Sequence, residues 1–119
     1  MISKFGYYIR KFRLTTGESL RLMAEKLKIS AAFLSAMEVG RKAVPMEYAK
    51  KIKEIYGLNE EQYKELYESI IETNQHVDIE ISKMNEDQKE ISIVFARKIE
   101  NADPKLIKKL RKALKDDKD

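Results

Sequence analysis

The chain has 119 residues, of which 43% are hydrophobic and none is Cys, and its formal net charge is +4. This length suits one small domain or a small domain with an appendage, and the lack of Cys excludes disulfides and thiolate metal sites. No apolar run approaches the roughly 20 residues that span a bilayer, and no signal peptide opens the sequence, so we expect a cytoplasmic protein with no membrane partner.

The first predicted helix covers residues 4–14. Phe5, Ile9 and Phe12 recur at helical spacing and define its apolar face. The run from Thr15 to Gly17 contains residues that favour turns, and we expect the helix to end there.

Residues 19–40 predict two short helices joined by a tight turn. Ser19 and Ser30 each precede an apolar set and can accept from an unpaired backbone N–H as N-terminal caps. Ala24 is small where the two helices would cross. The apolar residues recur in steps of three and four, at Leu20, Met23, Ala24 and Leu27, and then at Phe33, Leu34 and Met37. Helices joined in this way form the helix-turn-helix motif, whose second helix enters the major groove of DNA.

Two further helices are predicted before residue 74. The first runs from Pro45 to about Tyr56, and Asn59 with Gln62 forms a capping box at the start of the second. The inward stripe of the first is Met46, Ala49, Ile52 and Ile55. That of the second is Tyr63, Leu66, Tyr67, Ile70 and Ile71. We expect the second stripe to pack on the preceding helices, although a partner chain is an alternative.

Beyond residue 74 the hydrophobic pattern changes its period. Val77, Ile79 and Ile81 alternate with polar residues, which is typical of a strand with one apolar face. Because no other segment offers a second strand, the simplest pairing is with the same strand of another copy, which would create a homodimer. The alternative is an extended linker that packs on its own domain.

The remaining sequence predicts two helices. One covers residues 86–100, and the other follows the cap and first-turn pair Asp103 and Pro104. The whole chain is therefore predicted to be all-α or nearly so. A five-helix domain would occupy residues 1–73, and a dimerisation extension of one short strand and two helices would occupy residues 74–119.

Charge is distributed unevenly along the chain. Residues 1–56 carry twelve Lys or Arg and five Asp or Glu, whereas residues 57–100 carry five and eleven. Cationic side chains bind phosphates with release of counterions, so the first half is a candidate surface for nucleic acid. Charge alone is more typical of ordinary solvated helix faces, and the argument for DNA depends on the helix pattern.

The first half of the chain resembles the Cro/phage-repressor (XRE-type) helix-turn-helix family from about Phe5 to Ile55. The resemblance rests on residue types at the family's spacing, namely Ile9, Arg13, Met23, Ala24, Leu27, Ile29, Ser30, Leu34, Met37, Glu38 and Gly40. It implies a lambda-repressor-like five-helix domain. It also implies a structural ion pair between Arg13 and Glu38, which would attach the first helix to the end of the third.

The resemblance also implies which residues contact DNA. Bases are contacted from the start of the third helix and one turn further on, where this chain has Ala31, Ala32 and Ala36. Alanine can touch a thymine methyl group but cannot make bidentate hydrogen bonds to a base edge. Leu20 replaces the Gln that often contacts a phosphate in this family. The predicted DNA-contacting residues are Arg21, Ser30, Ala31, Ala32, Phe33, Ser35, Ala36, Arg41 and Lys42.

These features predict a sequence-specific transcriptional regulator, acting as a repressor that binds double-stranded DNA at a palindromic operator as a homodimer. One alternative is an antitoxin that binds both DNA and a toxin, and another is a protein-binding inhibitor that uses the fold as a scaffold. We expect neither catalysis nor a cofactor or metal. The only His, His76, has no second ligand nearby in the sequence, and the four Gly residues form no phosphate-binding loop.

Overall fold

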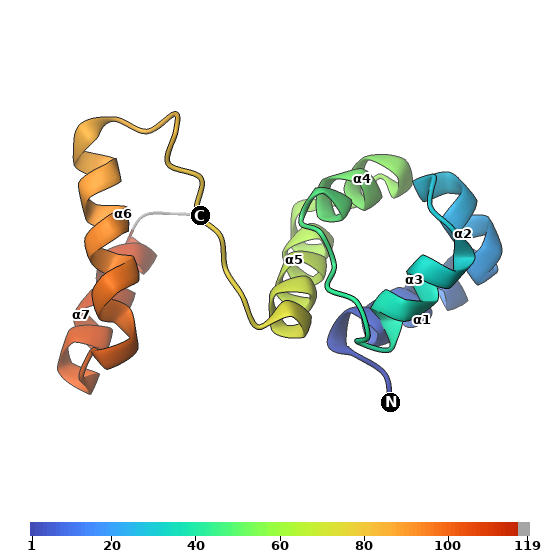
Figure 1. Ribbon diagram of the computed structural model, residues 1–119, viewed down its shortest axis with the longest axis horizontal. Coiled ribbons are helices and arrows are strands. Elements are labelled where there is room, and N and C mark those ends of the chain that lie inside the picture. Colours follow the sequence, from blue (N-terminus) through green and yellow to red (C-terminus); the bar gives the residue numbers. More distant parts are fainter. Residues whose placement is uncertain (117–119) are drawn as a thin grey trace. The chain divides into compact units, whose positions relative to one another are not determined.

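The computed structural model describes residues 1–116, which form seven α-helices and a short 3₁₀ helix and contain no strand (Figure 1). This part of the chain is therefore all-α, as the sequence predicts. No described helix combines the length and apolar character that a membrane span requires. The elements are α1 (Lys4–Thr16), α2 (Leu20–Leu27), α3 (Ala31–Glu38), α4 (Glu47–Tyr56), α5 (Glu60–Asn74), α6 (Glu86–Lys98), η1 (Ile99–Asn101) and α7 (Pro104–Asp116).

Local sequence signals determine where most of these helices begin. The hydroxyl oxygens of Ser19 and Ser30 accept from the backbone N–H groups of Leu22 and Phe33 at 3.1 and 3.0 Å, as predicted. Capping boxes made by an Asn and a Gln three residues later begin α5 and α6. Each cap satisfies backbone donors that have no partner within the helix, so the helix starts at the capping residue.

The chain divides into two compact units, of which the first is Met1–Val77 and the second begins at Asp78. In the first unit, α1 packs on α3 and α5, α2 packs on α3 and α4, and α4 packs on α5. The fully buried apolar side chains include Phe5, Ile9, Met23, Leu27, Leu34, Met37, Ile52, Leu66 and Ile70. The stripe of α5 therefore contributes Leu66 and Ile70 to the core of its own unit.

Polar contacts attach the start of α1 and the loop before α4 to the end of α5. The backbone N–H of Phe5 donates to the Thr73 hydroxyl at 2.8 Å. The Asn74 side chain accepts from the N–H of Val44 and donates to its C=O, both at 2.8 Å. Because an amide side chain supplies one acceptor and two donors, Asn74 replaces a backbone partner for the loop before α4.

The inward face of α4 differs from the predicted stripe. Tyr48 is buried together with Ala49 and Ile52, whereas Ile55 is exposed. The Tyr48 ring lies edge-on to Phe33 of α3, with ring centroids 6.3 Å apart. The core-facing stripe is thus rotated toward Tyr48 because α3 supplies an aromatic partner that the local pattern does not reveal.

The strand predicted over residues 77–82 is wrong for this structure. Residues 76–81 belong to no helix or strand, and Val77 and Ile79 are exposed while Ile81 is half-buried. A strand requires a neighbour that satisfies its N–H and C=O groups. The described residues provide no second strand, so the alternating pattern does not produce one.

The second unit contains α6, η1 and α7, which form a helical hairpin. The predicted helices are both present, and α6 continues through the 3₁₀ turn Ile99–Asn101 before α7 begins. The Asp103 carboxylate accepts from the N–H of Leu106 at 2.8 Å, as expected for a cap. The first unit includes residues 74–77, which the sequence pattern assigns to the extension.

Candidate nucleic-acid interface

The α2–α3 pair is joined by three residues, Lys28 to Ser30. Lys28 adopts a left-handed conformation with a φ of 61°, and the N–H of Ile29 donates to the C=O of Ala24 at 3.0 Å. Ala24 itself is 2% exposed, because it lies where the two helices meet. The turn is therefore closed by backbone hydrogen bonds, and a small residue lets the helices approach each other.

The start of α3 presents small side chains to solvent. Ser30 and Ala32 are exposed, whereas Ala31, Ser35 and Ala36 are half-buried. The Ser30 oxygen accepts the capping hydrogen bond described above, and its hydroxyl hydrogen can still donate outward. Six of the predicted contact residues thus lie on one short helix and its cap, and only two of them, Ser30 and Ala32, are exposed.

Phe33 has a different position from the one expected for a DNA contact. It is half-buried against the core, where its ring meets Tyr48. The Nζ atom of Lys51 lies 5.0 Å from the centre of the Tyr48 ring, so the ring that meets Phe33 also contacts a cation of α4. The sequence pattern by itself does not single out Lys51. Its signal is the i, i+3 spacing from Tyr48 on α4.

Three cations accompany this helix pair. Arg21 is exposed in the first turn of α2, and Arg41 and Lys42 are exposed directly after α3. The backbone N–H groups of Arg41 and Lys42 both donate to the C=O of Ala36, at 2.9 and 3.3 Å. The loop therefore folds back onto the end of α3, and the two cations are attached to the helix whose start is exposed.

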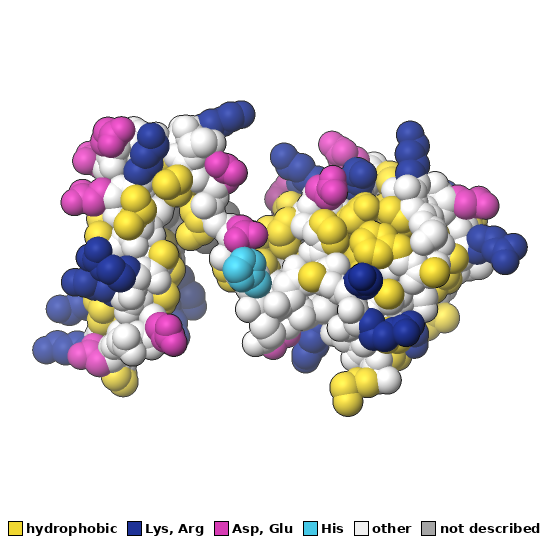
Figure 2. All heavy atoms as spheres, viewed as in Figure 1, with side chains coloured by type: hydrophobic (Ala, Val, Ile, Leu, Met, Phe, Trp, Pro, Cys, Tyr) yellow, Lys and Arg dark blue, Asp and Glu magenta, His cyan; other side chains and the backbone are white. Residues whose placement is uncertain are grey.

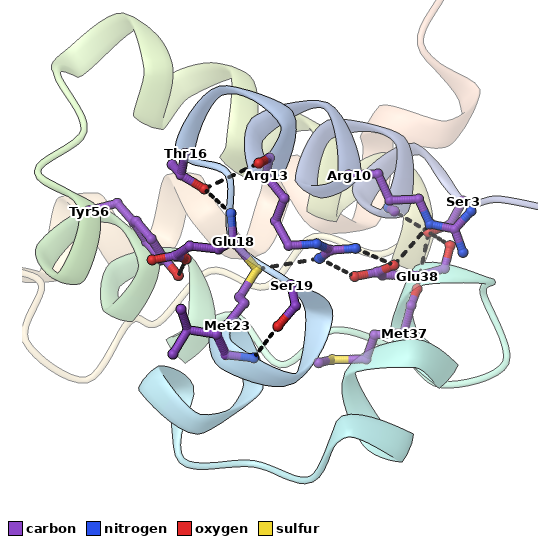
Figure 3. Close-up of polar contacts among 12 residues, drawn as sticks. Ser3, Arg10, Arg13, Thr16, Glu18, Ser19, Met23, Met37, Glu38 and Tyr56 are labelled. Atoms are coloured by element: carbon purple, nitrogen blue, oxygen red, sulfur yellow. Dashed lines mark hydrogen bonds and ion pairs between the residues drawn. The ribbon is translucent and has the colours of Figure 1, made fainter.

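A buried carboxylate lies at the C-terminal end of α3, the end onto which this loop folds. Glu38 is 0% exposed and accepts from Arg13 with both of its oxygens, at 2.6 and 3.2 Å (Figure 3). The structure thus contains the Arg13–Glu38 pair implied by the family resemblance. Arg10, which the family resemblance does not imply, adds a third hydrogen bond from its Nε at 3.0 Å. Arg13 also lies 3.5 Å from the sulfur of Met23 and so reaches α2.

The N-terminal end of α1 makes an unusually close contact with the same place. The N–H and the hydroxyl of Ser3 donate to the C=O of Glu38 at 2.8 and 2.9 Å. A Cβ atom on Gly6 would lie 2.8 Å from the Glu38 carbonyl carbon and closer still to its oxygen, so only glycine fits there. The signal in the sequence was a Gly inside a predicted helix, which usually marks a close approach of backbones.

The segment between α1 and α2 is attached to α4 through Glu18. Its carboxylate accepts from the ammonium group of Lys26 and from the Tyr56 hydroxyl. Figure 3 shows Glu18 next to Tyr56. These two hydrogen bonds, that from Lys26 being the larger effect, lower the pKa of Glu18 below its usual value. Burial and the bonded carboxylate raise the pKa of Tyr56. The start of α2, where Arg21 lies, is thereby connected to the core.

The predicted residues do not all gather at one place. The DNA-contacting set lies on α2, α3 and the loop after α3, the Arg13–Glu38 pair lies inside the first unit, and Val77, Ile79 and Ile81 lie in the connecting segment. Within residues 1–116, no group of three or more His, Asp or Glu side chains is arranged to hold a metal ion. Comparison with protein-family models, curated proteins and solved structures finds no match to this chain.

Proposed function

We propose that this protein is a sequence-specific DNA-binding transcriptional regulator of the Cro/phage-repressor type. In this proposal α1–α5 form a lambda-repressor-like domain, α2 and α3 are its helix-turn-helix, and α3 enters the major groove. The observation that carries the proposal is the exposed start of α3 on a short, closed turn, with Arg41 and Lys42 hydrogen-bonded through their backbone to the same helix.

The composition of this surface determines how it would recognise DNA. Arg21, Arg41 and Lys42 supply phosphate contacts, which position the protein without reading sequence. Ala32 fits against a thymine methyl group, and the Ser30 hydroxyl offers a single hydrogen bond to a base edge or a phosphate. With few direct base contacts, a large part of the specificity would come from the shape and deformability of the operator.

The regulator would act as a repressor that binds a palindromic operator as a homodimer. Two copies of α3 would enter successive major grooves about 34–36 Å apart. Occupancy of such a site overlapping a promoter would exclude RNA polymerase. If the protein protects no DNA upstream of its own reading frame at moderate salt, the regulator is contradicted and a protein-binding inhibitor is favoured. Co-purification of a stoichiometric partner together with DNA protection would favour an antitoxin.

Substitution of Ala32 by Asp tests whether α3 faces DNA. Ala32 is exposed, so the variant should fold normally, but a carboxylate at this position would face phosphates and base acceptors and abolish operator binding. The measurement is electrophoretic mobility shift on the upstream DNA, with circular dichroism to verify folding. Ala96→Asp introduces the same charge at an exposed helical position of the second unit and should bind normally. Retained operator affinity in Ala32→Asp would mean that α3 is not in the groove.

Substitution of Arg41 by Ala tests the phosphate contact at the end of α3. We expect weaker binding to every sequence and a slope of log K against log salt that is smaller by about one, because one fewer counterion is released. Fluorescence anisotropy between about 50 and 200 mM salt measures both quantities. Lys64→Ala, at an exposed position of α5, is the matched control and should leave the slope unchanged. An unchanged slope in Arg41→Ala would remove this residue from the interface.

A further inference from the structure

The second unit does not enclose a core. None of its described side chains is fully buried, although α6 and α7 carry many aliphatic residues. Ile91 and Leu114 are 65% and 66% exposed. A unit of this size buries too little apolar surface to be stable alone and is usually completed by oligomerisation or another cover. The apolar faces of α6 and α7 therefore need an occupant.

The uncovered surface is a groove on the hairpin. It has a volume of about 340 Å³ and is lined by Ile91, Val94 and Phe95 of α6, by Ile99 of η1 and by Leu106 and Leu110 of α7. Figure 2 shows hydrophobic side chains at the surface of this unit among acidic and basic groups. Lys98 lies at the same groove. An occupant must therefore match aliphatic side chains and charge together.

One acid, two aliphatic residues and one base of α6 are spaced symmetrically along the helix. Asp87, Ile91, Val94 and Lys98 are spaced by four, three and four residues, which places them along one stripe of the helix. When the helix is reversed, these four positions coincide with the original ones. Asp87 then occupies the position of Lys98, and Lys98 that of Asp87. A second α6 in antiparallel orientation would place Asp87 opposite Lys98 twice, and Ile91 opposite Val94 twice.

We propose that the groove is occupied by the hairpin of a second copy, with the two α6 helices antiparallel across a two-fold axis. The contact is isologous, as expected for a homodimer, and the four helices form a bundle with an apolar centre and charged ends. A uniformly acidic partner would meet Asp87, and a uniformly basic one would meet Lys98, so the stripe favours its own copy. This inference rests on the homodimer of the proposed function and replaces the strand of residues 77–81 as its contact.

Charge exchange in the full-length protein tests this contact. In Asp87→Lys and in Lys98→Asp, both end pairs become like-charged, and we expect the dimer dissociation constant to rise about tenfold or more. The double variant Asp87→Lys/Lys98→Asp restores both pairs. An equimolar mixture of the two single variants should also form dimers, because the chains then complement each other. Sedimentation equilibrium without DNA, from about 1 to 100 μM, measures each case at low salt, where screening is weak.

A second pair of variants separates the groove from the rest of α6. Ile91→Asp should dissociate the dimer, whereas Ile93→Asp, two residues away on the other side of the helix and 53% exposed, should not. A monomeric wild type at 100 μM would overturn the proposal, as would single variants that dimerise normally or fail to complement each other. The oligomeric state is measured without DNA, and operator binding is measured separately. A monomer that still binds its operator overturns the homodimer and this contact but not DNA recognition, whereas a dimer that binds no DNA overturns only the regulator.

Discussion

Substitution of Glu38 by Ala is expected to lower the free energy of unfolding by roughly 3–5 kcal/mol, which corresponds to a fall in the melting temperature of at least about 12 °C. The carboxylate is fully buried, and Arg13, whose side chain is only 11% exposed, would keep a charge with no partner. Chemical denaturation followed by circular dichroism measures the loss. Unchanged melting would contradict this role of the pair.

Two companion variants identify the cause of the loss. Arg10→Ala removes only the partner that is 43% exposed, and we expect a cost of about 1 kcal/mol or less. Glu38→Gln preserves the shape but not the charge, so its stability should fall between wild type and Glu38→Ala. At a temperature where Glu38→Ala is folded, its operator affinity should be close to that of wild type, because Glu38 does not reach the surface.

Substitution of Gly6 by Ala is expected to lower the free energy of unfolding by about 3 kcal/mol, which is the upper end of the usual cost of overpacking a core. The sign of this change in stability distinguishes a close backbone contact from an ordinary helical position. In an exposed helix the same change stabilises by about 1 kcal/mol, since alanine is the better helix former. Here the added methyl group would collide with the Glu38 carbonyl, which is backbone and cannot rotate away.

The control for Gly6 lies on the same helix. Lys11 is exposed, so Lys11→Ala should change the free energy of unfolding by no more than about 0.5 kcal/mol. Thermal melting of the two variants is compared with that of wild type. If Gly6→Ala melts at or above the wild-type temperature, the close crossing of α1 and α3 is not required for the fold.

The stability losses expected for Glu38→Ala and Gly6→Ala both involve one stripe of side chains on α1 and its N-cap. Ser3, Gly6, Arg10 and Arg13 follow one another at three- and four-residue spacing, and all of them contact or face the C-terminal end of α3. The adjoining apolar stripe enters the core through Phe5 and Ile9. Helix α1 thus holds the buried end of α3, while the other end of α3 is left exposed. This arrangement would keep a recognition helix rigid without using its outer surface.

Much of the candidate interface could be predicted from local sequence. Ser19, Ser30 and the short connection after Leu27 define where α2 and α3 begin and end, because a cap acts within one turn of its helix. The exposure of Ser30 and Ala32 follows from the helical period once Leu34 and Met37 are buried. The position of Phe33 could not be decided in this way, since the sequence places it both in the apolar set and among the DNA contacts, and its packing depends on Tyr48 from another helix.

The sequence by itself determined the all-helical class, the order of the helices and most of their caps, because periodicity and capping are interactions between near neighbours. Tertiary structure decided three other features. Gly6 lies against the backbone of Glu38, 32 residues away in the chain, Arg10 and Arg13 share one carboxylate, and residues 77–81 form no strand without a neighbour. Each depends on groups that are distant in the chain, and a local pattern shows only one side of such a contact.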